Sequence, residues 1–208
     1  MRFEEHFAGG RTHLAWHVFP GFSPDPITPL ARPDAPDGDG WVGRVTNQSL
    51  GGFASLAYAG DAGLADYTLE AWIFVDVTAE ERSPLQGLAV RVDPAGQRFY
   101  RLAAQFGATP RLTLAYVGRD VHNFPIYLEE WGAGDLPGGI PAQSGWQHVL
   151  LRVANEVLQV RWNGRDLPRG LIRDARIPAG YFGVYTNFVG GEQVTQTLVD
   201  AVVVRTAG

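Results

Sequence analysis

The sequence predicts an all-β protein, built as an antiparallel sandwich of two sheets. Three observations support this prediction. Apolar and polar residues alternate along several short runs, which is the pattern of half-buried strands. Glycine (26 residues) and proline (14 residues) are spread between these runs, where turns are needed. Beyond a single turn near residues 61–65, we find no convincing helix. The 208 residues suit one domain, residues 1–208, of this class.

The clearest strand is Tyr67–Val77. Its alternation places two sets of side chains on opposite faces: Tyr67, Leu69, Ala71, Ile73 and Val75 on one, and Thr68, Glu70, Trp72, Phe74 and Asp76 on the other. Further strands are expected in the order Leu88–Val92, Arg98–Phe106, Arg111–Val117, Trp146–Val153, Val157–Trp162, Tyr181–Phe188 and Thr197–Arg205. Two segments break the pattern and are predicted as long loops: residues 20–40, which hold six prolines, and residues 120–145.

Composition excludes several classes of function. The net charge of −5 and the absence of a basic run predict no nucleic-acid partner. Without cysteine there is no disulfide and no thiolate metal site. No apolar run is long enough to predict a membrane span. The N-terminus lacks the apolar core of a signal peptide, so we expect an extracellular protein if a leader was removed and a cytoplasmic one otherwise. The oligomeric state stays open.

Several segments resemble strands of the concanavalin A-like lectin/glucanase superfamily, in particular its laminin-G-like jelly rolls. These segments are Asp66–Ala71, Gly87–Val92, Phe99–Leu102, Gly145–Val149, Val160–Gly164, Ile177–Tyr185 and Leu198–Val203. The resemblance covers roughly residues 66–205 and implies a two-sheet antiparallel jelly-roll sandwich. The superfamily includes lectins, adhesion modules and hydrolases, so the resemblance implies a fold more than a chemistry.

The side chains opposite the core set predict a sugar-binding face. An aromatic ring stacks on the apolar face of a pyranose, while arginine, amide and carboxylate groups bind its hydroxyls. Trp131, in a glycine-flanked loop, is a further candidate for stacking. The candidate carbohydrate-binding residues are Glu70, Trp72, Arg91, Arg101, Gln105, Trp131, Tyr185 and Asn187. The alternative interpretation is that Trp72 packs beneath a loop, Trp131 caps the sandwich and the arginines are solvated.

The sequence offers little for catalysis. A retaining glycosidase needs two carboxyl groups about 5–5.5 Å apart, and the Glu-x-Asp-x-x-Glu pattern of the superfamily's glucanases is absent. Glu129 and Glu130 are adjacent and would point to opposite faces of a strand. The run at residues 180–187 resembles the tyrosine-bearing strand of jelly-roll alginate lyases, but their companion motifs are missing.

We therefore predict a noncatalytic, lectin-like module that recognises an oligo- or polysaccharide. The alternatives are a glycan-processing hydrolase or lyase, and a protein-binding adhesion domain. The resemblance also implies a structural calcium ion held by oxygen ligands where the terminal strands meet. Its candidate ligands are Glu4, Glu5 and Asp200, which would otherwise be ordinary acidic residues.

Overall fold

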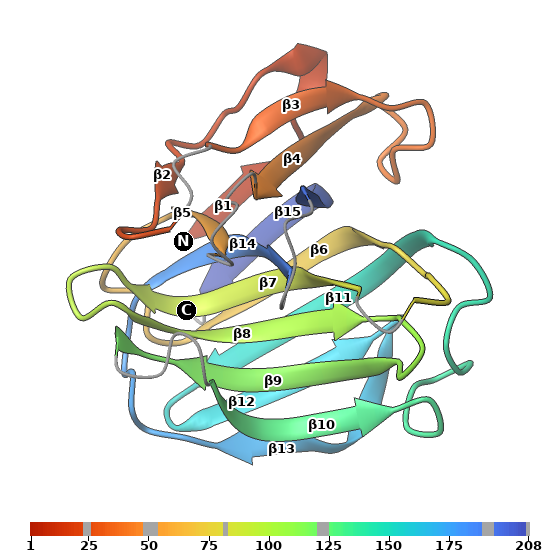
Figure 1. Cartoon of the computed structure of the whole chain (residues 1–208). Coiled ribbons are helices and arrows are strands. Elements are labelled where there is room, and N and C mark those ends of the chain that lie inside the picture. Colours follow the sequence, from red (N-terminus) through yellow and green to blue (C-terminus); the bar gives the residue numbers. More distant parts are fainter. Residues whose placement is uncertain (23–25, 48–53, 81–82, 120–124, 189–193, 207–208) are drawn as a thin grey trace.

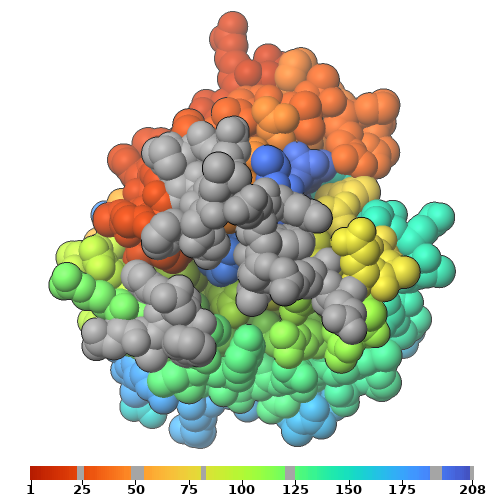
Figure 2. All heavy atoms as spheres, viewed as in Figure 1, coloured from red at the N-terminus to blue at the C-terminus, as the bar shows by residue number. Residues whose placement is uncertain are grey.

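A computed structural model describes residues 1–22, 26–47, 54–80, 83–119, 125–188 and 194–206. Two antiparallel sheets pack face to face as a sandwich (Figure 1). The two-sheet antiparallel jelly roll expected from the sequence is confirmed. Figures 1 and 2 share one view, in which β7–β10 lie in front of β11–β13. In Figure 2, strands β3 and β4 (orange) form one end of the molecule, and β9 and β10 (green) lie toward the other.

The eight-stranded sheet has the order β13-β12-β11-β6-β15-β4-β3, with β1 paired to β15 off this path. Its strands are β1 (Arg2–Glu5), β3 (Thr28–Ala31), β4 (Trp41–Asn47), β6 (Tyr67–Val75), β11 (Gly145–Ala154), β12 (Val157–Trp162), β13 (Arg165–Arg173) and β15 (Thr195–Thr206). The seven-stranded sheet has the order β10-β9-β8-β7-β14-β5-β2. Its strands are β2 (His17–Val18), β5 (Ser55–Ala59), β7 (Pro84–Asp93), β8 (Arg98–Gln105), β9 (Arg111–Val117), β10 (Ile126–Gly132) and β14 (Tyr181–Phe188). A single 3₁₀ turn, η1, spans Ala8–Gly10.

The core lies between the sheets and follows the predicted alternation. Along β6 every second residue is buried, beginning with Tyr67, and the residues between are half-buried. Buried side chains of β6 share one cluster with those of β7, β8 and β14 from the facing sheet. Each such aliphatic or aromatic side chain stabilises the fold by about 1.5–3 kcal/mol. On β14, Phe182 and Val184 face this core, whereas Tyr185 belongs to a second cluster on the outer side of the sheet.

The two segments expected as long loops each contain a strand, which corrects the prediction. Strand β3 includes Pro29, which lacks an N–H donor; β3 tolerates it because it is the edge strand. Strand β10 cannot be predicted from alternation, because a β-bulge between Tyr127 and Glu129 breaks the pattern. Among the described residues, no helix is long and apolar enough to cross a membrane.

Candidate functional site

The structure distributes the eight predicted carbohydrate-binding residues over different parts of the fold. Four lie on the outer face of the seven-stranded sheet: Arg101 and Gln105 on β8, and Tyr185 and Asn187 on β14. Glu70 and Trp72 lie on β6 of the other sheet, Arg91 lies in a bulge of β7, and Trp131 lies on β10. The eight residues therefore do not form one continuous face.

Arg101 and Tyr185 form the centre of the first group. The Arg101 Nη1 atom donates a hydrogen bond to the Tyr185 hydroxyl (3.3 Å), and the guanidinium carbon lies 5.2 Å from the Tyr185 ring centroid. Strand β7 runs between them and presents small residues: Ala89 pairs with Arg101, and Gly87 pairs with Tyr185. Because these two residues have no bulky side chain, the arginine and the tyrosine can extend over β7 and meet.

A partly exposed rim continues from this centre toward β10. Gln105 accepts a hydrogen bond from Arg111 Nε (3.0 Å) and donates one to the Ser83 carbonyl oxygen (3.2 Å). The Arg111 guanidinium also reaches Glu130 (3.4 Å) and lies 6.0 Å from the ring of Tyr127, which is 48% exposed. The outer face thus combines an arginine–tyrosine pair with an amide and an exposed aromatic ring. We call the set Arg101, Gln105, Tyr185 and Asn187 the β8–β14 face.

Arg91 has a structural environment of a different kind. It is 1% exposed, and its positive φ of 49° lies in the bulge between Val90 and Asp93. The bulge directs the guanidinium toward the facing sheet, where it donates to the carbonyl oxygens of Ala65, Asn155 and Ile177. These bonds tie the start of β6, the β11–β12 turn and the segment before β14 together at one end of the sandwich.

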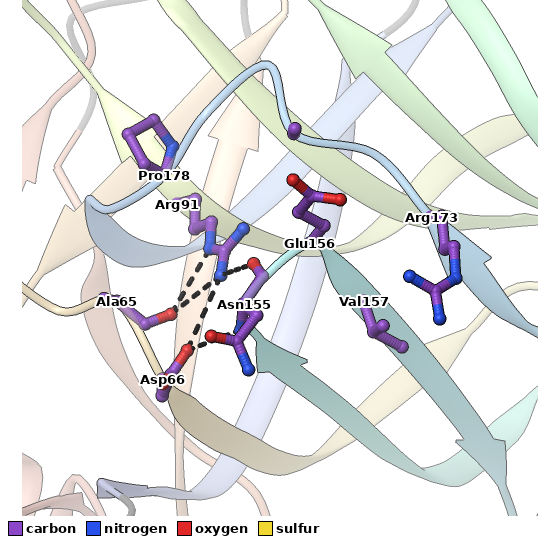
Figure 3. A pocket seen from close by; sticks show the side chains of 9 residues that line it. Ala65, Asp66, Arg91, Asn155, Glu156, Val157, Arg173 and Pro178 are labelled. Carbon is purple, nitrogen blue, oxygen red and sulfur yellow. Dashed lines mark hydrogen bonds and ion pairs between the residues drawn. The ribbon is translucent and has the colours of Figure 1, made fainter.

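Arg91 also forms the inner wall of a pocket of about 610 Å³ (Figure 3). Its other lining residues are Ala65, Asp66, Asn155, Glu156, Val157, Arg173, Ala175 and Pro178. Asp66 accepts a hydrogen bond from the Asn155 N–H (2.7 Å) and lies 3.9 Å from the Arg91 guanidinium. Figure 3 shows Glu156 and Arg173 on either side of Val157. No sequence pattern indicates this pocket, because its walls come together only when the strands pair.

Trp131 is not in a loop, which corrects the expectation. It lies on β10 with 0% of its surface exposed, inside the main core cluster. Its indole Nε1 donates to the Pro168 carbonyl oxygen (2.6 Å). In this position the ring holds β10 against β13 and is not offered to a ligand.

Glu70 and Trp72 belong to a half-buried cluster on the outer side of the eight-stranded sheet. The Glu70 carboxylate contacts His148 Nε2 (3.0 Å) and Arg205 Nη1 (2.6 Å), and the Trp72 and His148 rings lie 5.0 Å apart. Burial raises the pKa of Glu70, but the contacts with Arg205 and His148 outweigh it and leave the pKa below its ordinary value. Sequence reasoning missed His148 and Arg205, because their approach to β6 depends on strand register.

The candidate calcium ligands were expected where the first and last strands meet, and β1 does pair with β15, with Glu5 opposite Val202. The Glu5 carboxylate is buried, and both of its oxygens are already occupied. It accepts hydrogen bonds from the backbone N–H groups of Phe7, His13 and Leu14, from the Trp16 indole, and it contacts His13 Nδ1. A cation would have to replace these donors.

Asp200 is fully buried and close to other acidic residues. It accepts hydrogen bonds from the N–H groups of Asp37 (3.0 Å) and Ala201 (2.7 Å). Burial, together with the negative charges of Asp37 and Asp39, raises the pKa of Asp200 to about 6. Glu4 is paired with Arg2 instead. Over the described ranges, no group of three or more histidine, aspartate or glutamate residues is arranged to hold a metal ion.

Comparison with solved structures defines the class of this molecule as a two-sheet jelly-roll sandwich. It is similar to the carbohydrate-binding module CBM66 from Bacillus subtilis (TM-score 0.53, 14% identity, 92% of each chain covered). It is also similar to the cellulose induced protein Cip1 (TM-score 0.61, 12% identity, 99% of this chain and 97% of that chain). A legume lectin-like domain from Entamoeba histolytica matches with a TM-score of 0.53 and 14% identity, over 93% of this chain and 90% of that domain.

These similarities confirm a concanavalin A-like fold for this chain. No protein-family model matches the sequence, and no curated protein matches it. At identities of 12–14%, the structural matches establish the fold and leave the chemistry to be argued from the site.

Proposed function

We propose that the protein is a noncatalytic, lectin-like carbohydrate-recognition module that binds an oligo- or polysaccharide on the β8–β14 face. The observation that carries the proposal is the contact of Arg101 with Tyr185 over the small residues Gly87 and Ala89. The Arg101 guanidinium and the Tyr185 phenol are buried, at 2% and 4% exposure, and the half-buried amides of Gln105 and Asn187 lie on the same sheet face. Together these groups supply hydrogen-bond donors and acceptors of the kind that bind sugar hydroxyls.

The comparisons with solved structures also support a carbohydrate-related role. One structural neighbour is a carbohydrate-binding module and another is a lectin-like domain, and each is matched over at least nine tenths of its length. Those binding activities belong to the neighbouring proteins. For this chain they favour carbohydrate over other ligand classes.

The carboxylates near the face favour binding over hydrolysis. Glu129 contacts Arg169 on β13 (3.0 Å), whereas Glu130 contacts Arg111 on β9 (3.4 Å). The two adjacent acids therefore pair with different arginines, as their expected opposite directions require. Each carboxylate is held in an ion pair with a different arginine, so the two do not act together as the pair of carboxyl groups that a retaining glycosidase uses.

The experiment is a glycan-array screen of the purified protein, repeated with two variants. We expect Tyr185→Leu to lose the bound glycans and Trp72→Ala, on the other sheet, to retain them. Loss of binding in Trp72→Ala alone would move the site to the Glu70 cluster. An array without any bound glycan would reject the recognition proposal and favour a protein-binding adhesion domain.

The enzymatic alternative has its own readout in the same screen. Each glycan that binds is incubated with the protein, and the products are assayed for new reducing ends and for the ultraviolet absorbance of unsaturated sugars. A hydrolase produces only the first signal, whereas a lyase produces both. Either signal, lost in Tyr185→Leu, would replace recognition with catalysis at this face.

The structural calcium ion and the closer likeness to laminin-G-like jelly rolls stay predictions. Calcium is tested by measuring the midpoint of thermal unfolding with calcium and with a chelator. A higher midpoint with calcium would support the ion, and Asp200→Asn would then be expected to abolish the difference. Equal midpoints would reject it.

A further inference from the structure

We infer that the glycan recognised by the β8–β14 face is acidic, and that a carboxylate of the sugar pairs with Arg101. This inference rests on the proposed function and narrows its ligand to uronic or sialic acid glycans. It is drawn from the unusual electrostatic position of one buried arginine.

Arg101 is 2% exposed, yet its guanidinium is almost without partners. Among the residues that the structure describes, its one hydrogen bond goes from Nη1 to the neutral Tyr185 hydroxyl, and its buried Nε has no acceptor there. No carboxylate of the described residues forms an ion pair with it, whereas nine of the fifteen other arginines that the structure describes have such a partner. A buried charge without a counter-charge or a full set of hydrogen bonds destabilises the fold.

Arg91 is a buried arginine with a structural role, and its hydrogen bonds can be compared with those of Arg101. It is as deeply buried as Arg101, but its Nε, Nη1 and Nη2 atoms all donate to backbone carbonyl oxygens. Arg101 lies one strand away with an aromatic ring against it and most donors unused. The contrast between the two arginines indicates that the partner of Arg101 comes from outside the described chain.

A carboxylate matches the N–H donors of Arg101 better than a hydroxyl does. Its two oxygens match the planar, parallel N–H donors of a guanidinium and form a charge-assisted bidentate pair. The protein carries a net charge of −5, so it has no general attraction for acidic polymers. Recognition of an acidic sugar therefore requires a specific local cation. Because Arg101 is 2% exposed, binding has to displace the atoms that cover it, and we expect association slower than about 10⁵ M⁻¹s⁻¹.

The first test compares matched ligands. The array holds uronic and sialic acid glycans, the same glycans after reduction of their carboxyl groups to alcohols, and sulfated neutral glycans. We expect binding to acidic members that is lost on carboxyl reduction. Binding that survives reduction, or that is confined to neutral glycans, would overturn the inference while the proposed function stands. Preference for sulfated neutral glycans would also overturn the inference, because the anion bound would be a sulfate and not a carboxylate. No binding at all would reject both proposals.

The second test compares variants on the best acidic glycan. We expect Arg101→Met to raise the Kd about 100-fold, as removal of one partner of a buried charge pair does. Arg101→Lys keeps the charge without the planar fork and should raise the Kd about tenfold. The control is Arg152→Met on β11, an exposed residue of the other sheet, which removes the same charge and should leave the Kd within about twofold.

A stability readout separates a ligand-binding arginine from a structural one. We expect the denaturation midpoint of the unliganded protein to rise in Arg101→Met, because an uncompensated buried charge is replaced by an apolar side chain. It should fall in Arg91→Met, because three carbonyl oxygens lose their donor. A fall in both variants would show that Arg101 is structural and would overturn the inference.

Discussion

Replacement of Glu5 by glutamine tests whether one buried carboxylate organises the N-terminal segment. The amide keeps one oxygen, which can replace Oε2 and accept from the N–H groups of His13 and Leu14. Its NH₂ group then faces the Phe7 N–H, which loses its acceptor Oε1. An unsatisfied buried N–H costs about 1–3 kcal/mol, and the remaining bonds lose their charge assistance. We therefore expect Glu5→Gln to lower the free energy of unfolding by roughly 3 kcal/mol.

The assay is urea unfolding followed by tryptophan fluorescence. With a slope of about 2 kcal/mol per molar urea, the loss corresponds to a midpoint lower by roughly 1.5 M. The control is Glu4→Gln, the neighbouring residue, whose side chain is 38% exposed and pairs with the exposed Arg2. It should change the free energy by no more than about 0.5 kcal/mol. Equal, small shifts in the two variants would refute the role assigned to Glu5.

The same carboxylate predicts a pH dependence. Burial raises the pKa of Glu5, but its hydrogen bonds from the N–H groups of Leu14, Phe7 and His13 outweigh burial and hold the pKa below its ordinary 4.5. Between the two pKa values the unfolded chain binds more protons than the folded one. The stabilisation is therefore complete above pH 4.5 and is lost as the pH falls through the folded pKa. Glu5→Gln should lack this acid-side loss.

Three further predictions concern other positions. The pKa of Asp200 is raised to about 6, so between about pH 4 and 6 the folded state keeps a proton that the unfolded state has released. The free energy of unfolding therefore falls as the pH rises through this range. In Asp200→Asn, unfolding free energies measured at pH 4.5 and 7 should not show this fall. In Gly87→Ala the new Cβ would lie 1.9 Å from the Leu102 carbonyl oxygen, so circular dichroism should show a large drop in melting temperature, and a drop below about 2 °C would contradict the close packing of β7 on β8. Trp131→Ala should lower the free energy of unfolding in urea by about 3–5 kcal/mol, because it empties a core position; a loss below about 1 kcal/mol would show that the ring is not packed as described.

Some strands could be predicted from the sequence because two distinct sets of side chains alternate along them. In β6 and β14 the side-chain period of two is unbroken, and both the strands and their core faces follow the prediction. Strands β3 and β10 could not be found this way, because Pro29 and the bulge after Tyr127 remove the periodic signal. Their pairing comes from neighbouring strands that supply the hydrogen bonds.

The candidate site was less predictable than the fold, because a face depends on which sheet each strand joins. Alternation placed Glu70 and Tyr185 correctly away from the core, but it could not show that they face outward from opposite sheets. The bulge that redirects Arg91 is equally invisible in the sequence. The contact between Arg101 and Tyr185 could not be predicted either, because it depends on small residues of β7 that lie between them only in the folded sheet.

The position of β15 sets the order in which this sheet can be assembled. It pairs with β1, β4 and β6, and it follows all of them along the chain. Tyr67 on β6, for example, pairs with Thr206 on β15, which is made much later. While the polypeptide leaves the ribosome, the facing edges of β4 and β6 stay without hydrogen-bonding partners until β15 is made. Such long-range closure is slow, and open edges invite pairing between chains. In the cell, the newly made chain is therefore expected to depend on chaperones at this stage.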